Sequence, residues 1–162
     1  MSLQISIRWY ADRAVWRLIG LRYLPLLAGL SLAWEIAQLP LYTLWSEGSP
    51  AFIAFSVMHC TLGDALVGAN ALAVALIVTR APRCANWRWL RIALVTALAG
   101  TAYTGVSEWL NTVAVRNWAY SELMPVVPLL GAEIGLSPLL QWLLLPPLAL
   151  RLAVSTFKGE IP

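Results

Sequence analysis

The sequence predicts an all-α integral membrane protein: a four-transmembrane-helix bundle with a short N-terminal interfacial helix and a partly re-entrant outer loop. Three observations predict this fold class. Of the 162 residues, 60% are hydrophobic and only 12% are charged, whereas soluble domains are about 25% charged. Four stretches are apolar over the roughly 20 residues that a helix needs to cross the hydrocarbon core. A net charge of +3 and two cysteines argue against nucleic-acid binding and a disulfide framework.

The predicted elements form a single transmembrane domain over residues 1–162. Residues 1–18 carry three arginines among aromatic side chains, which is typical of a helix lying at the membrane surface. A cleaved signal peptide fits less well, because the apolar run that follows is too long and no A-x-A site ends it. We expect the spans at about 22–45, 51–79, 90–115 and 136–152.

The connections between the spans carry recognisable turn signals. Residues 46–50 contain Gly and Pro and predict a tight turn, and 80–88 predict a polar loop. The outer loop 116–135 is moderately apolar but holds two prolines and two glutamates. Because non-helical backbone at membrane depth must be packed in protein or line a wet cavity, we expect this loop to fold over, or partly into, the outer mouth of the bundle. Ser137-Pro138 should cap the last span, and Pro146-Pro147 should kink it.

The distribution of basic residues predicts the orientation. Ten of the eleven Lys and Arg residues lie in the N-terminal segment, the 80–91 region and the C-terminal end. Lys and Arg in short loops resist translocation, so we expect both termini to be cytoplasmic, in a bacterial inner membrane or a plasma membrane. The simplest role of these side chains is to anchor the protein to anionic membrane lipids.

Polar side chains inside the spans are the candidate functional groups. A charged group in hydrocarbon costs at least ~2.5–3.5 kcal/mol. Glu35 and Gln38 share one helical stripe of the first span, and Glu108 and Asn111 share one stripe of the third. We expect both stripes to face the interior of the bundle, in its outer half.

The second span carries polar groups on two different faces. His59, Gly63 and Asn70 share one face, whereas Asp64 points about 140° away from His59. The two ionisable side chains are therefore not expected to meet at one spot. The small residues around Gly63 would let a neighbouring helix approach closely.

These considerations give the candidate site. The expected catalytic residues are Glu35, His59, Asp64, Glu108 and Asn111. The expected substrate-binding residues are Trp34, Gln38, Glu122, Gln141 and Trp142. If a divalent metal ion is the cofactor, its expected ligands are His59, Glu35 and Glu108, although the chain has no paired-histidine motif.

Three functions are compatible with such a site. The first is an intramembrane enzyme that acts on a lipid or isoprenoid-like substrate by carboxylate/His acid–base or metal-assisted chemistry. The second is an oligomeric binding or transport protein for a small solute or ion. The third is a non-catalytic subunit or assembly factor that binds a membrane protein partner. The number of buried carboxyl groups favours the enzyme. The expected partners are membrane lipids and either further copies of the chain in a homo-oligomer or another membrane protein.

Overall fold

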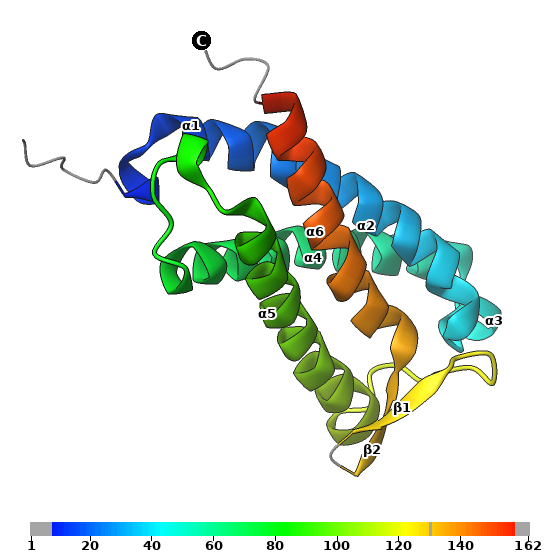
Figure 1. Ribbon diagram of the computed structural model, residues 1–162. Coiled ribbons are helices and arrows are strands. Elements are labelled where there is room, and N and C mark those ends of the chain that lie inside the picture. The colour runs from blue at the N-terminus through cyan, green and yellow to red at the C-terminus, as the bar shows by residue number, and fades with distance from the viewer. Residues whose placement is uncertain (1–7, 130, 158–162) are drawn as a thin grey trace, which may run out of the picture.

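The computed structural model describes residues 8–129 and 131–157, and this part of the chain is mostly helical (Figure 1). Four helical segments are long and apolar enough to cross a membrane, which confirms the predicted number of spans. They are Arg13–Leu41, Pro50–Val78, Trp89–Ala114 and Leu136–Ser155. The chain therefore has the architecture of a multi-pass membrane protein.

The first segment is one continuous helix. Its parts are α1 (Arg13–Leu18), the π-helical turn η2 (Ile19–Tyr23) and α2 (Leu24–Gln38). The short η1 (Trp9–Ala11) precedes it and is separated from α1 by the extended residue Asp12. Asp12 caps α1 by accepting a hydrogen bond from the backbone N–H of Ala14 at 3.0 Å. Because α1 continues through η2 into α2, residues 13–18 form an N-terminal extension of the first helix, and the predicted location of residues 1–18 at the membrane surface stays a prediction. Residues 1–7 of that prediction lie outside the described ranges.

The first span ends at Leu41 rather than near Trp45. The elements that follow are η3 (Leu39–Leu41), α3 (Leu44–Glu47) and α4 (Pro50–Val78). Pro40 has no N–H to continue the α-helical ladder, and Tyr42 then adopts an extended conformation. Ser49 caps α4 by accepting a hydrogen bond from the N–H of Phe52 at 3.3 Å, with Pro50 at the first helical position.

The connection after α4 is tied to the start of the first helix. It contains η4 (Cys84–Asn86) and leads into α5 (Trp89–Trp109) and η5 (Leu110–Ala114). The backbone N–H of Cys84 donates to Asp12 Oδ2 at 3.0 Å, so one carboxylate holds two segments together. Burial, and then the charge of Asp12, raise the pKa of the Cys84 thiol to about 11.

The loop after η5 crosses one end of the bundle and contains an antiparallel hairpin that the sequence did not predict. Its strands are β1 (Val126–Leu129) and β2 (Ala132–Gly135), joined through Gly131 at φ +79°. Before the hairpin, the N–H of Ser121 donates to the carbonyl of Leu41 at 2.9 Å, and the N–H of Thr43 donates to that of Ala119 at 3.1 Å. We call the end of the bundle that holds α3 and this hairpin the hairpin end. Partial re-entry of the loop into the membrane stays a prediction.

The last helix, α6 (Leu136–Phe157), runs through Pro146 and Pro147 and is longer than predicted. It packs against α2 and α5, and α4 packs against the same two helices. Two glycines allow close approach: a Cβ on Gly68 would lie 2.1 Å from Leu27, and one on Gly100 would lie 2.1 Å from the ring of Trp142.

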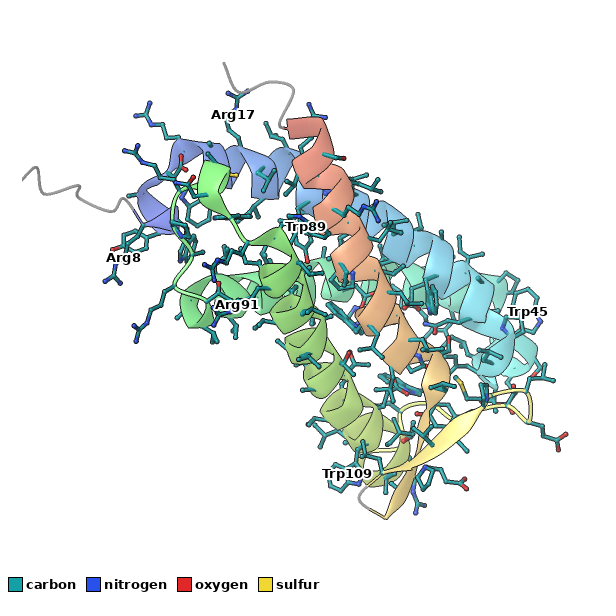
Figure 2. The ribbon with its side chains drawn as sticks, viewed as in Figure 1. Arg8, Arg17, Trp45, Trp89, Arg91 and Trp109 are labelled. Carbon is teal, nitrogen blue, oxygen red and sulfur yellow. The ribbon has the colours of Figure 1, made fainter. Side chains whose placement is uncertain are left out.

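The interior divides into two halves. An apolar core fills the half opposite the hairpin end, with large members that include Leu18, Tyr23, Leu72, Ile92 and Leu150. In Figure 2, Arg8, Arg17 and Arg91 lie around this half, whereas Trp45 and Trp109 lie near the hairpin end. Several buried polar side chains, including Gln38, Glu108, Ser137 and Gln141, lie on the hairpin side of this core.

Candidate functional site

Three carboxyl groups from three helices face the interior of the bundle. They are Glu35 on α2, Asp64 on α4 and Glu108 on α5. Together with the amides of Gln38 and Gln141 on α2 and α6, which are both buried, we call them the carboxyl cluster. All five residues were predicted as site residues from the sequence.

The amides link the carboxyl groups of α2 and α4. Gln141 Nε2 donates to Asp64 Oδ2 at 2.6 Å, and Gln141 also lies within hydrogen-bonding reach of Glu35. Gln38 Nε2 donates to Glu35 Oε1 at 3.0 Å and accepts at Oε1 from Ser137 Oγ at 2.9 Å. The network therefore joins three helices, and the side chain of Ser137 serves it rather than capping α6 as the sequence predicted.

Glu108 is held by the loop at the hairpin end. The phenol of Tyr120 donates to Glu108 Oε2 at 2.5 Å and accepts from the N–H of Gly135 at 2.9 Å. Tyr42 and Trp118 lie beside the same carboxyl group. The hydroxyl of Tyr42 is close enough to Glu35 and Glu108 to interact with both charges, so it connects the two parts of the cluster.

The two phenols stay in their proton-donating form. Burial, and then its hydrogen bond to Glu108, raise the pKa of Tyr120 well above the ordinary tyrosine range. Burial, and then the charge of Glu108, raise the pKa of Tyr42 in the same direction. Their rings lie 5.6 Å apart and their backbones form an isolated β-bridge. A tyrosine pair from two connecting segments thus closes the site from the hairpin end.

The carboxyl cluster has no basic counter-charge nearby in the sequence. The chain has no Lys or Arg between Arg22 and Arg80, and none between Arg91 and Arg116. Amides, hydroxyls and phenols provide the polar contacts instead. Such neutral donors orient a carboxyl group while leaving it able to take up or release a proton.

Two predicted binding residues lie next to members of the cluster in the sequence; Trp142 is buried and Trp34 is half-buried. Trp142 follows Gln141 and packs its ring over Gly100. Trp34 precedes Glu35, and its indole Nε1 is buried with no hydrogen-bond partner in the described part of the chain. Thr61 Oγ1 is unpartnered in the same way. These orphaned donors leave polar capacity that the chain itself does not use.

Three other predicted residues are not brought to the cluster. His59 is exposed and stacks on Phe55 at a ring distance of 5.7 Å. Asn111 donates to the carbonyl of Ser107 at 2.8 Å and accepts from Asn117 at 2.7 Å. Glu122 lies exposed on the loop.

The expected metal ligands do not converge. Within residues 8–129 and 131–157, no group of three or more His, Cys, Asp or Glu side chains is placed to hold a metal ion. His59 points away from Glu35 and Glu108, as its position on the helical face indicates. The donors that do come together are carboxyl and amide oxygens.

Tyr120 and Ser137 complete the network, and sequence reasoning missed both roles. Tyr120 lies in a loop, where helical periodicity gives no information about direction. Ser137-Pro138 matched a capping signal, so the hydrogen bond from the Ser137 hydroxyl to Gln38 was not predicted. Helical periodicity places Tyr42 on the same stripe as Glu35 and Gln38. This shared stripe could have identified Tyr42 as a residue of the site.

An apolar groove of about 660 Å³ lies between α2 and α4 at the hairpin end, lined by Leu32, Ile36, Leu39 and Val57 among others. Leu32, Ile36 and Leu39 flank Glu35 on its helix. On α4, Val57 is followed on the same face by Thr61 and then by Asp64, one and two turns further on. The described residues that line the groove include no member of the carboxyl cluster, but the groove and the cluster share α2 and α4.

No known protein family, curated protein or solved structure matches this chain. The fold and the site define its class: a membrane-protein-like bundle of four apolar helices with a carboxyl cluster in which Glu108 is buried and Glu35 and Asp64 are half-buried.

Proposed function

We propose that this protein is an intramembrane enzyme that acts on a lipid or isoprenoid-like substrate by carboxyl acid–base chemistry. The observation that carries the proposal is the gathering of carboxyl groups from three helices. Glu35 and Asp64 share one hydrogen-bonded network, and Glu108 lies close enough to Glu35 for their charges to interact. The bacterial inner membrane or a plasma membrane, with both termini cytoplasmic, is the setting that the distribution of basic residues favours.

The energetics favour a functional rather than a structural role. Each charged group in the bilayer interior costs at least ~2.5–3.5 kcal/mol, so three carboxyl groups cost roughly 8–10 kcal/mol if all are charged. An interhelical hydrogen bond in a membrane protein contributes only about 0.6 kcal/mol on average. Bonds between neutral amides and hydroxyls would join the same helices at a lower cost. Function explains the carboxyl groups better than helix association does.

The contacts support distinct roles for the carboxyl groups. Glu108 is the proposed acid or base, because Tyr120 presents its proton directly to Oε2. Glu35 is its charge partner, and Gln141 orients Asp64. Asn111, which the sequence analysis placed among the catalytic residues, has its amide engaged with Ser107 and Asn117 instead.

The groove between α2 and α4 supports an apolar substrate. Its lining is formed mostly by aliphatic side chains and Trp45. Val57 in this lining lies about two helical turns from Asp64 on the same face of α4. An acyl or isoprenoid chain in this groove would bring its polar or unsaturated end to the cluster. The unpartnered hydroxyl of Thr61 is a donor available to that end.

Deuterium incorporation would test the proposal. The purified protein is placed in nanodiscs made with a total polar lipid extract of its host, incubated in D₂O, and the lipids are analysed by mass spectrometry. We expect the wild type to change or label a lipid species, and Glu108→Gln and Glu35→Gln to reduce that rate at least about 100-fold, the lower range of acid–base contributions. Glu47→Gln, on exposed α3, is the matched control and should keep the wild-type rate. An unchanged lipid pool with the wild type, or equal rates in all three variants, would contradict the proposal.

A further inference from the structure

The outward face of α4 carries polar side chains that the chain itself does not cover. His59 and Asn70 are both exposed, and they lie about 20° apart around the helix. The buried residues of α4, such as Val57, Gly68 and Leu72, lie on the opposite side. His59 and Asn70 therefore point directly away from the interior of the bundle.

Their depth makes this exposure unfavourable in lipid. The 29 residues of α4 give a helix of about 43 Å, whereas the hydrocarbon core is about 30 Å thick. His59 and Asn70 each lie roughly 12–14 Å from an end of the helix. When α4 is centred in the membrane, the Cα atoms of both residues lie inside the hydrocarbon core. Polar side chains at that depth pair with other polar groups.

Neither side chain has its hydrogen-bonding capacity filled within the described residues. Asn70 Nδ2 donates to the carbonyl of Leu66 at 2.8 Å, which leaves its side-chain oxygen and one amide hydrogen. His59 only stacks against Phe55. Gly63, between them, is also unexplained by internal packing, because a Cβ there would meet nothing within 4 Å. Gly63 therefore leaves the helix surface between His59 and Asn70 open to a second helix.

The residues on this face follow a heptad spacing of alternating three and four positions. We call them the α4 outer seam: Phe52, Ser56, His59, Gly63, Leu66, Asn70, Ala73 and Ile77. This spacing is the one by which two helices pack side by side along a coiled-coil interface. Small residues in the seam permit close approach, and a single Asn within such an interface fixes register and partner number.

We propose that the α4 outer seam is the interface of a parallel homodimer in the membrane. Two copies inserted in the same sense are related by a two-fold axis along the membrane normal, so identical seam residues face one another. The amide of Asn70 offers one donor and one acceptor and is complementary to itself. Neutral imidazole likewise donates from one nitrogen and accepts at the other, so His59 also pairs with its own copy. Because these side chains can pair with identical side chains, a second copy of this chain is the partner that best fits the α4 outer seam.

Cysteine cross-linking in membranes tests the geometry. Single cysteines replace His59, Leu66 or Asn70 in a background in which Cys60→Ser and Cys84→Ser remove the native thiols. Met58 and Val78 are exposed α4 positions on either side of the seam and are the matched controls. With a mild oxidant, seam cysteines should form disulfide-linked dimers at least about tenfold faster than the controls, because only seam positions lie near the two-fold axis.

Energy transfer between differently labelled copies in lipid vesicles tests the energetics. Asn70→Leu should weaken dimerisation roughly three- to thirtyfold, the range expected from interhelical polar contacts. Gly63→Leu should weaken it while leaving the thermal unfolding of the bundle unchanged, since the site is open within the chain. Gly29→Leu, at an equally open position on α2, should leave dimerisation unchanged.

Three outcomes would overturn the proposal. Equal cross-linking at Met58 and His59 would show random encounter, and the absence of energy transfer at every protein-to-lipid ratio would show a monomer. Cross-linking of seam cysteines only to a different membrane protein would assign the seam to a heteromeric partner. None of these outcomes depends on whether the carboxyl cluster is catalytic.

Discussion

Individual glycines show how absent side chains set the distances between helices in this bundle. Gly68 accommodates Leu27, and Gly100 accommodates the ring of Trp142. Trp142 in turn follows Gln141, whose amide reaches Asp64. The contact at Gly100 thus sets how closely α6 approaches α5 beside the carboxyl cluster.

Gly100→Ala should therefore destabilise the protein. Its Cβ would fall 2.1 Å from Trp142 Cε3, and a buried indole has little freedom to move aside. We expect a loss of about 1–3 kcal/mol in the free energy of unfolding, which is the usual cost of overpacking. The measurement is unfolding by SDS in detergent micelles. Gly29→Ala meets no atom within 4 Å and should be neutral or stabilising by up to about 1 kcal/mol; equal losses in both variants would contradict the packing argument.

At the scale of elements, hydropathy predicts the spans because each must be apolar over its whole length, whatever it packs against. The ends are set by local chemistry that competes with this signal: Pro40 stops the first span early, and Asp12 starts it early. The strands β1 and β2 were not predicted because Pro128 disfavours a strand. In addition, the pairing of the two strands depends on the contacts that fix the loop to the rest of the bundle.

In the site, too, some residues could be predicted from hydropathy alone, whereas others depend on tertiary contacts. Glu35, Asp64 and Glu108 were predictable because carboxyl groups in hydrocarbon are expensive, and the burial pattern confirms that His59 and Asp64 point to different faces. The bond between Tyr120 and Glu108 was not predictable, since the direction of a loop side chain depends on tertiary contacts. Asn111 lies at the π-helical end of its span, where the ideal 100° periodicity no longer applies.

Tyr120 links the loop to α5, and removing its hydroxyl should loosen that end of the bundle. Tyr120→Phe loses the bond to Glu108 and leaves the N–H of Gly135 without its acceptor. We expect a loss of about 1.5–3 kcal/mol in the free energy of unfolding, as for hydrogen bonds to charged groups. Tyr103→Phe, on the exposed face of α5, is the matched control and should change the stability by less than about 0.5 kcal/mol.

The same pair of variants gives a pH dependence. Because the pKa of Tyr120 is raised in the folded state, the folded protein keeps a proton that the unfolded chain loses above its ordinary value of about 10. The stabilisation is fully present below pH 10 and is lost as the pH rises further. Wild type and Tyr103→Phe should therefore lose more stability between pH 9 and 11 than Tyr120→Phe does. Identical slopes would show that the phenol is not buried against Glu108.

At the scale of the whole molecule, polar chemistry and positive charge occupy opposite ends. The carboxyl cluster lies toward the hairpin end, whereas the loop between α4 and α5 brings several exposed arginines close to the N-terminal segment (Figure 2). In a membrane, this asymmetry favours an orientation with the arginine-rich end in the cytoplasm. The carboxyl cluster then lies in the outer half of the bilayer, and the groove between α2 and α4 opens to the outer leaflet.

Accessibility of introduced cysteines tests this orientation. In the background lacking Cys60 and Cys84, a cysteine replaces either Glu47 or Asn86, which are both exposed and lie in connecting segments at opposite ends of the bundle. A membrane-impermeant maleimide added to intact cells should label the cysteine at position 47 and not the one at position 86, because positively charged loops are retained in the cytoplasm. Both should react after permeabilisation, which controls for accessibility. The reverse pattern would place the carboxyl cluster in the cytoplasmic half, so that a lipid substrate would have to enter from the inner leaflet.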